Sequence, residues 1–341
     1  MRFSVLISTI AHNVGFSPLI HNCWPSRITT LCYHGVIPKT LQHCDHGFYT
    51  TVSATEFRRQ LEWLGRRFHV VSCAQIREHF LETRLLPPRP LLITFDDGYW
   101  NNLALAAPAL REYGFPATFF LSTNYIGSSD LFWFDDLPRR VMKWSGREIE
   151  RPGGGEPLPL PPDPAERREV CRRIGSLCKR VPNSVRLEYL EYLRRGTADH
   201  ELPWDENMYR ILNWDEVREL ARQGFEIGSH TQTHPILAQL EEDAIGSELE
   251  GSRAHIEAEL GARCFALAYP NGTAADYDLR TRRRTVAAGF DLAFTMADRP
   301  YGSHEDRYTV SRLGVSGHVP LGVFTFSVSG ARALARRIVH A

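Results

Sequence analysis

The sequence lacks a net charge, a long apolar run and a regular cysteine pattern, and each absence narrows the possible function. Lys and Arg together number 40, as do Asp and Glu, so the formal charge is zero and nothing indicates a nucleic-acid partner. No apolar run approaches the roughly 18 residues of a membrane span. The seven cysteines are scattered, without a C-x-x-C pair, which favours reduced cysteines in a cytoplasmic protein over a disulfide framework.

Both ends of the chain carry weak targeting features. Arg2 precedes a short apolar segment, as in an export signal, but polar residues follow and no small-residue cleavage site is present. We therefore expect residues 1–26 to be an ordinary N-terminal segment, the alternative being export with 1–22 as the signal. The tail, 331–341, is expected to be a small basic helix, for which weak contact with a membrane surface is one option.

Hydrophobic patterns between these ends predict strands that alternate with helices. Eight short strands are expected, at 27–33, 68–72, 91–95, 117–121, 225–229, 264–269, 290–294 and 308–315. Helices are expected at 54–64, 74–81, 102–113, 214–223, 236–260 and 279–288. This order predicts an α/β protein with a distorted (β/α) barrel over 27–330, in which the chemistry lies at the C-terminal ends of the strands.

The alternation stops over 128–212, which we interpret as a helical insertion in the barrel. Its stretch 152–164, rich in Pro and Gly, is expected to be irregular, and two arginine-rich helices should follow at 165–181 and 184–195. An acidic pair, Asp135 and Asp136, follows three aromatic residues in this segment. The start of a helix beside aromatic packing is the simpler interpretation of that pair.

Two groups of polar residues follow predicted strands. Asp96 and Asp97 end the apolar run 91–95, and because side chains alternate along a strand they should point in different directions. His230 and His234 follow the strand at 225–229, four residues apart, so a helix or tight turn would place both rings on one face. Two imidazoles and one carboxylate are typical of a catalytic metal site, with zinc as the usual ion.

These two segments, Thr94–Gly98 and His230–His234, resemble the first two motifs of the NodB-homology polysaccharide deacetylases, which are metal-dependent carbohydrate esterases. The resemblance spans 27–320 and leaves 128–212 unmatched. It implies a hydrolase that removes N-acetyl groups from a sugar or polysaccharide. The open alternatives are a hydrolase of linear or cyclic non-sugar amides and a catalytically weak glycan-binding relative.

The same resemblance implies a role for each residue. Asp97, His230 and His234 would bind the metal and Asp96 would be the base. The 268–272 segment (Ala-Tyr-Pro-Asn-Gly) is similar to the third motif, so the backbone N–H of Asn271 would bind the oxyanion. The family arginine that supports the base is replaced by Ala268, and Arg312 is the candidate substitute.

The general acid is the least certain role. The late Leu-x-His motif of the family is not evident, and His318 is only a nearby alternative. His34, which follows the first strand, is similar to the acid of the permuted branch that deacetylates poly-N-acetylglucosamine, and a buried structural histidine is the other interpretation. Tyr99 and Trp100 could stack on a sugar ring or pack against the next helix.

Overall fold

Nine short strands form one sheet in which every pairing is parallel. The computed structural model describes residues 27–44, 50–198, 202, 204–297, 306–315, 317 and 319–329. The strand order is β12-β11-β10-β9-β6-β5-β1-β13, with β4 paired to the side of β5. These strands are β1 (Thr29–Tyr33), β4 (His69–Val70), β5 (Pro90–Phe95), β6 (Thr118–Leu121), β9 (Glu226–Ser229), β10 (Ala266–Ala268), β11 (Leu292–Thr295), β12 (Val310–Ser311) and β13 (Leu313–Gly314).

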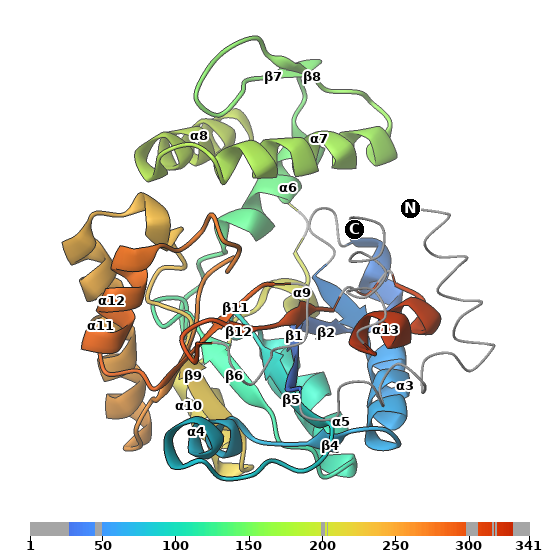
Figure 1. Cartoon of the computed structure of the whole chain (residues 1–341). Coiled ribbons are helices and arrows are strands. Elements are labelled where there is room, and N and C mark those ends of the chain that lie inside the picture. Colours follow the sequence, from blue (N-terminus) through green and yellow to red (C-terminus); the bar gives the residue numbers. More distant parts are fainter. Residues whose placement is uncertain are drawn as a thin grey trace, which may run out of the picture.

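The sheet curls until its two ends meet at Arg312. This residue alone separates β12, at one end of the strand order, from β13 at the other. The Arg312 N–H donates to the carbonyl of Thr295 beside β12, whereas the Val315 N–H donates to Cys32 on β1. The result confirms the predicted distorted (β/α) barrel (Figure 1). The single strand expected at 308–315 is wrong, because the chain changes neighbours at Arg312.

The alternation of side chains along β1 and β5 separates a packing face from a chemical face. Tyr33 and Phe95 are paired in register and stack at 5.4 Å between ring centroids, and Phe57 of α3 packs on both rings. The neighbours of Tyr33 and Phe95 along each strand therefore point the other way, into the barrel. Among them, Thr94 and Asp96 both contact Arg312.

Helices cover the outside of the barrel (Figure 1). They are α3 (Ala54–Gly65), α4 (Cys73–Glu82), α5 (Ala107–Glu112), α10 (Trp214–Arg222), α11 (Glu242–Leu260), α12 (Leu279–Ala287) and α13 (Leu321–Val328). Shorter turns precede several of them: η1 (Lys39–Cys44), the π-turn η2 (Asn102–Ala106) and η3 (Leu237–Gln239). As the sequence predicts, Ser53 and Asn213 cap the N-termini of α3 and α10.

Two predicted helices differ in detail. The helix expected at 102–113 begins as the π-turn η2 and becomes α-helical only at Ala107. Pro108 has no N–H to donate to the preceding turn, which accounts for the irregular start. The helix expected at 236–260 is divided into η3 and α11, with Glu241 extended between them.

The insertion forms a separate layer over one end of the barrel (Figure 1). The layer contains α6 (Trp133–Lys143), β7 (Glu148–Ile149), β8 (Leu158–Pro159), α7 (Pro164–Cys178) and α8 (Asn183–Gly196). The last helix of the insertion, α9 (Glu206–Tyr209), lies outside this layer and packs against Ile37 of the barrel domain. The layer's own apolar cluster includes Leu137, Ile174 and Leu193. The predicted helices are confirmed, including a helix start at Asp135 and Asp136, but 152–164 is not wholly irregular because β8 pairs antiparallel with β7.

Two further strands, β2 (Gly35–Ile37) and β3 (Thr51–Ser53), form a small parallel sheet immediately after β1. Among the described residues, no helix is both long enough and apolar enough to cross a membrane. The N-terminal segment 1–26, the tail 331–341 and His318 lie outside the described residues, so the expectations for them stay predictions.

Candidate active site

Three buried side chains converge at the ends of β5 and β9. Asp97 follows β5, and His230 follows β9 with His234 in the next turn. The Nε2 atoms of His230 and His234 lie 3.6 and 3.5 Å from the same oxygen of Asp97, Oδ1. All three side chains are at most 5% exposed. The structure thus brings together the three residues that the sequence proposes as metal ligands.

Backbone turns aim these side chains. Asp97 has a φ of +75°, and Thr231 and His234 have φ values of +68° and +55°, so 230–234 is an irregular tight turn and not a helix. The Thr231 hydroxyl accepts a hydrogen bond from the His234 N–H at 3.1 Å. Non-glycine residues adopt such φ values at a cost of about 1–3 kcal/mol, and they cluster at functional sites.

The two imidazole rings are also held from behind. Nδ1 of His230 donates to the carbonyl of Ala268 at 2.7 Å, which leaves Nε2 as the basic nitrogen toward Asp97. The rings of Phe132 and Phe134, from the start of the insertion, pack against His234 with centroids 5.5 and 5.0 Å away. A hydrogen bond and aromatic packing therefore fix the two rings.

The donor set fits a divalent metal. Both carboxylate oxygens of Asp97 are buried and accept no hydrogen bond in the part of the chain that the structure describes. Burial and the adjacent Asp96 raise the pKa of Asp97 well above its usual value, and burial lowers the pKa of His230 and His234. A cation would offset the cost of the buried carboxylate, and neutral imidazoles are the form that binds metals. Two histidine nitrogens and one carboxylate suit zinc and its neighbours among the transition metals.

Asp96 lies beside the same histidine, with its Oδ2 3.8 Å from Nε2 of His230, and both of its oxygens are paired. Arg312 donates to both of its oxygens, from Nη1 at 2.6 Å and from Nη2 at 2.7 Å, and both side chains are buried. Burial alone would raise the pKa of Asp96, but the Arg312 guanidinium, helped by His230, holds it well below its usual range. Nη1 of Arg312 lies 3.2 Å from the Thr94 hydroxyl, which further fixes the guanidinium.

His34 and Cys32 complete the surroundings of Asp96. Their side-chain donor atoms and those of Asp96 all lie within 4.8 Å of one another. The Cys32 thiol donates to Oδ2 of Asp96 at 3.3 Å, and burial lowers the pKa of His34 to about 4. Cys32 is absent from the predicted site, yet it lies on β1 two residues before His34, which directly follows the strand, so both side chains fall on the same face.

The third predicted motif lies beside the histidines. Asn271 stands in the turn after β10 with a φ of +57°, three residues beyond Ala268, whose carbonyl binds His230. Ala268 itself is fully buried in the core.

The structure decides between the two options for Tyr99, stacking on a sugar ring or packing. Tyr99 is only 4% exposed, and its hydroxyl donates to Asp135 at 2.6 Å, so its ring belongs to the core and not to a stacking surface. The neighbouring Trp100 is half-buried, and the Arg210 guanidinium lies 4.9 Å from its ring centroid. The alternative of packing is therefore the correct one for Tyr99.

Comparison with known protein families identifies the chain. The profile described as "Polysaccharide deacetylase" matches residues 84–157 and 180–293, more than half of the 341 residues. The chain belongs to the polysaccharide deacetylase family. The matched ranges contain Asp97, His230 and His234, whereas His34 and Arg312 lie outside them. The expectation that all of 128–212 would be unmatched is wrong, because only 158–179 of it falls outside the match.

Curated relatives of this family member match it over short stretches. The poly-beta-1,6-N-acetyl-D-glucosamine N-deacetylase of Staphylococcus epidermidis is 35% identical over 94 residues, which are 27% of this chain and 32% of that protein. The protein of the same name from Escherichia coli K12 is 28% identical over 137 residues, 40% of this chain and 19% of the relative. The matches thus span about a third or less of these relatives.

Solved structures resemble this deacetylase-family chain over most of its length. The Streptococcus pyogenes deacetylase PplD covers 89% of the chain with a TM-score of 0.58 at 15% identity, and 99% of PplD is matched. IcaB from Ammonifex degensii also covers 89%, with a TM-score of 0.57 at 18% identity, and 97% of it is matched. At such identities the likeness establishes the fold.

Proposed function

We propose that this member of the polysaccharide deacetylase family is a metal-dependent hydrolase that removes N-acetyl groups from an N-acetylated sugar or glycan. The observation that carries the proposal is the pair of adjacent aspartates with opposite surroundings. Asp97 lies beside two histidines and accepts no hydrogen bond from the residues that the structure describes, whereas Arg312 donates to both oxygens of Asp96. The names of the curated relatives, which act on N-acetylglucosamine polymers, support this substrate class.

Asp97, His230 and His234 would hold the metal, for which zinc is the usual ion with such ligands. Such an ion supplies Lewis acidity toward the acetamide carbonyl and lowers the pKa of a bound water from 15.7 to about 7. The protein contributes a dry and fixed donor set, since the side chains are buried and Ala268 orients His230.

Asp96 would accept the proton of the attacking water. Arg312 holds both carboxylate oxygens, so the group stays ionised and oriented. A general base contributes typically 10²–10⁴-fold to the rate. The alternative of a catalytically weak, glycan-binding protein was based on the absence of an arginine at position 268. The contact of Arg312 with Asp96 argues against that alternative, because Arg312 can support the base instead.

His34 would protonate the departing amine. With a pKa of about 4 its ring is neutral at pH 7, so it must first receive a proton. Asp96, in the same cluster, is the group that would pass on the proton taken from water. The positively charged ring would then be a strong acid beside the amine. The Asn271 N–H, in the turn after β10, is the proposed donor to the carbonyl oxygen as it becomes negative.

The test is acetate release from a panel of N-acetylated oligosaccharides, linear and cyclic non-sugar amides, and aryl acetates. We expect turnover of at least one oligosaccharide, abolished by a chelator and restored by zinc, cobalt or nickel. Turnover of the non-sugar amides alone would replace the glycan with the alternative substrate class. Full activity after complete metal removal would refute the proposed chemistry.

A further inference from the structure

A cavity of about 600 Å³ lies where the insertion meets the barrel. Its wall is formed by the loop after β6 (124–131), by α6, by the end of α8 and by the turn that carries the histidines. Its polar lining includes Arg139, Arg140, Arg194, Asp130, Asp136 and Thr233. A volume of this size falls in the range of small-molecule sites.

The cavity adjoins the proposed metal ligands. Thr233, which lines it, directly precedes His234 in the chain. Tyr125, on its wall, stacks on Phe132 at 4.0 Å, and Phe132 in turn packs against the ring of His234. A ligand in the cavity would therefore lie one layer of side chains from Asp97, His230 and His234, which we call the metal group.

The charges on the wall favour an anion. Three arginines face two carboxylates, those of Asp130 and Asp136. Asp136 is shared among the arginines: Nε of Arg140 donates to it at 2.7 Å, whereas Arg139 and Arg194 approach only to 3.8 and 3.6 Å. Contacts of 3.6 and 3.8 Å are still ion pairs, so the excess of positive charge rests on the three arginines that line this wall against two carboxylates.

The arginines differ in how firmly they are held. Arg140 also donates to the Thr197 hydroxyl at 2.8 Å, and its side chain is 17% exposed, so it is part of the scaffold. Arg194 is 52% exposed, and its second ion-pair partner, Glu191, is 3.9 Å away. Its guanidinium therefore has donors left for a planar anion such as a carboxylate or phosphate.

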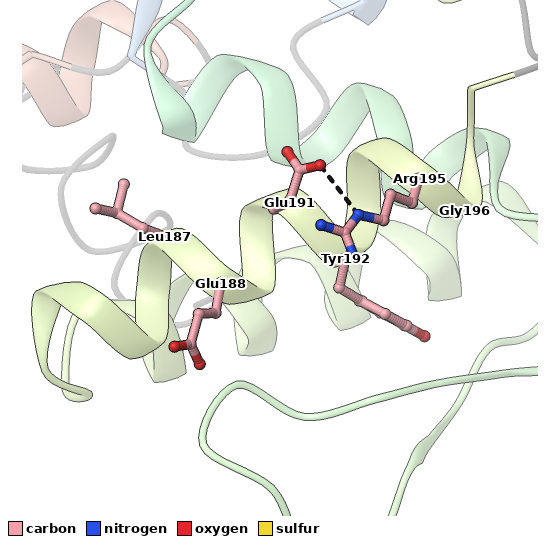
Figure 2. A pocket seen from close by; sticks show the side chains of 6 residues that line it. All are labelled: Leu187, Glu188, Glu191, Tyr192, Arg195 and Gly196. Carbon is pink, nitrogen blue, oxygen red and sulfur yellow. Dashed lines mark hydrogen bonds and ion pairs between the residues drawn. The ribbon is translucent and has the colours of Figure 1, made fainter.

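A second cavity, on another side of α8, has the opposite charge balance. It measures about 730 Å³ and is lined by side chains of α8 only (Figure 2). Two glutamates, Glu188 and Glu191, outnumber the single Arg195, whose Nε donates to Glu191 at 3.1 Å (Figure 2). Arg195 is thus a matched control for Arg194: same helix, same charge, different face.

We propose that the cavity beside Thr233 binds an anionic substituent, a carboxylate or a phosphate, on the glycan whose acetamide reaches the metal group. This inference rests on the proposed deacetylase function and deepens it, since it assigns an acidic glycan as the substrate. It differs from what the names of the curated relatives indicate, because a poly-N-acetylglucosamine is uncharged.

The experiment compares three N-acetylated oligosaccharides of equal length: one neutral, one with a uronic-acid carboxylate and one with a phosphate monoester. Acetate release gives kcat/KM for the metal-loaded wild type, Arg194→Gln and Arg195→Gln. We expect the wild type to favour one of the anionic substrates by about tenfold or more, as a charge-assisted hydrogen bond allows. Arg194→Gln should lower that preference several-fold through KM, and added salt should weaken it. Arg195→Gln should keep it.

The preferred anion identifies its source, since the carboxylate and the phosphate are separate substrates. Equal kcat/KM for all three substrates, or equal losses in Arg194→Gln and Arg195→Gln, would overturn the inference. Calorimetric binding of the same oligosaccharides to Asp96→Asn separates this result from failure of the proposed function. If nothing is hydrolysed but the anionic oligosaccharide still binds more tightly, the deacetylase proposal fails and the anion site stands. Equal dissociation constants would reject the anion site alone.

Discussion

The metal group and the arginine-lined cavity lie side by side, but they differ in how a buried carboxylate is compensated by positive charge. In the metal group, Asp97 is buried without a hydrogen-bond donor in the described structure, and two neutral histidines face it. In the cavity, Asp136 is surrounded by three arginines. The barrel thus leaves a buried carboxylate without a hydrogen-bond donor where we propose that a cation binds. In the insertion, three arginines surround the single carboxylate of Asp136, and the extra positive charge suits recognition of a negatively charged ligand.

The largest expected effect tests the metal group directly. His230→Ala and Asp97→Ala should each lose the bound divalent ion, of which we expect about one per chain in the wild type, because a three-ligand catalytic site cannot spare a ligand. Metal content by elemental analysis and acetate release would both fall to background. His255→Ala, which removes a half-exposed histidine on α11, is the control and should retain both. Stoichiometric metal in His230→Ala and Asp97→Ala would sink the assignment.

The second effect separates the two aspartates. Asp96→Asn should keep the metal, since Asp96 faces Arg312, yet lose about 10²- to 10⁴-fold in turnover because the proton acceptor is gone. Metal content and kcat measured on the same preparation make the comparison. A loss of less than about tenfold would mean that Asp96 is not the base.

The third effect depends on the leaving group. His34→Ala should depress amide hydrolysis by about 10²- to 10⁴-fold and spare aryl acetates, whose phenolates depart without a proton. The ratio of amide to aryl-ester turnover is the measurement, and His318→Ala is the comparison. A ratio that collapses in His318→Ala but not in His34→Ala would transfer the acid role to His318.

The smallest effect concerns the clamp on Asp96. Arg312→Met should lower the free energy of unfolding by about 3–5 kcal/mol, because it leaves Asp96 buried and uncompensated. Arg312→Lys should cost less stability but still slow turnover by roughly tenfold, since an ammonium cannot hold both carboxylate oxygens. Arg263→Met, at a half-exposed pair with Asp291, should change stability by less than about 1 kcal/mol in denaturant titrations. Equal losses of unfolding free energy in Arg312→Met and Arg263→Met would contradict the expected difference between a buried and a half-exposed ion pair.

Local sequence patterns are enough to predict much of the barrel and the proposed metal ligands. Apolar runs, caps and side-chain alternation are local, so they predict the strands that end at Asp97 and His230. The contact between Arg312 and Asp96 joins residues 216 positions apart and depends on closure of the sheet, so sequence could only nominate it. No sequence motif marks Cys32 as a site residue, although its spacing of two residues from His34 is visible in the sequence. The paired strands β7 and β8 were missed because two-residue strands leave no periodicity to detect.

The position of Arg312 at the junction of the sheet ends has a consequence for biosynthesis. A ribosome completes both aspartates and both histidines long before it reaches the last two strands, so a nascent chain can carry every proposed metal ligand and still lack the partner of Asp96. The guanidinium lies between β12 and β13, where the two ends of the sheet meet. If Asp96 is the base as proposed, a chain truncated before these strands is expected to be inactive.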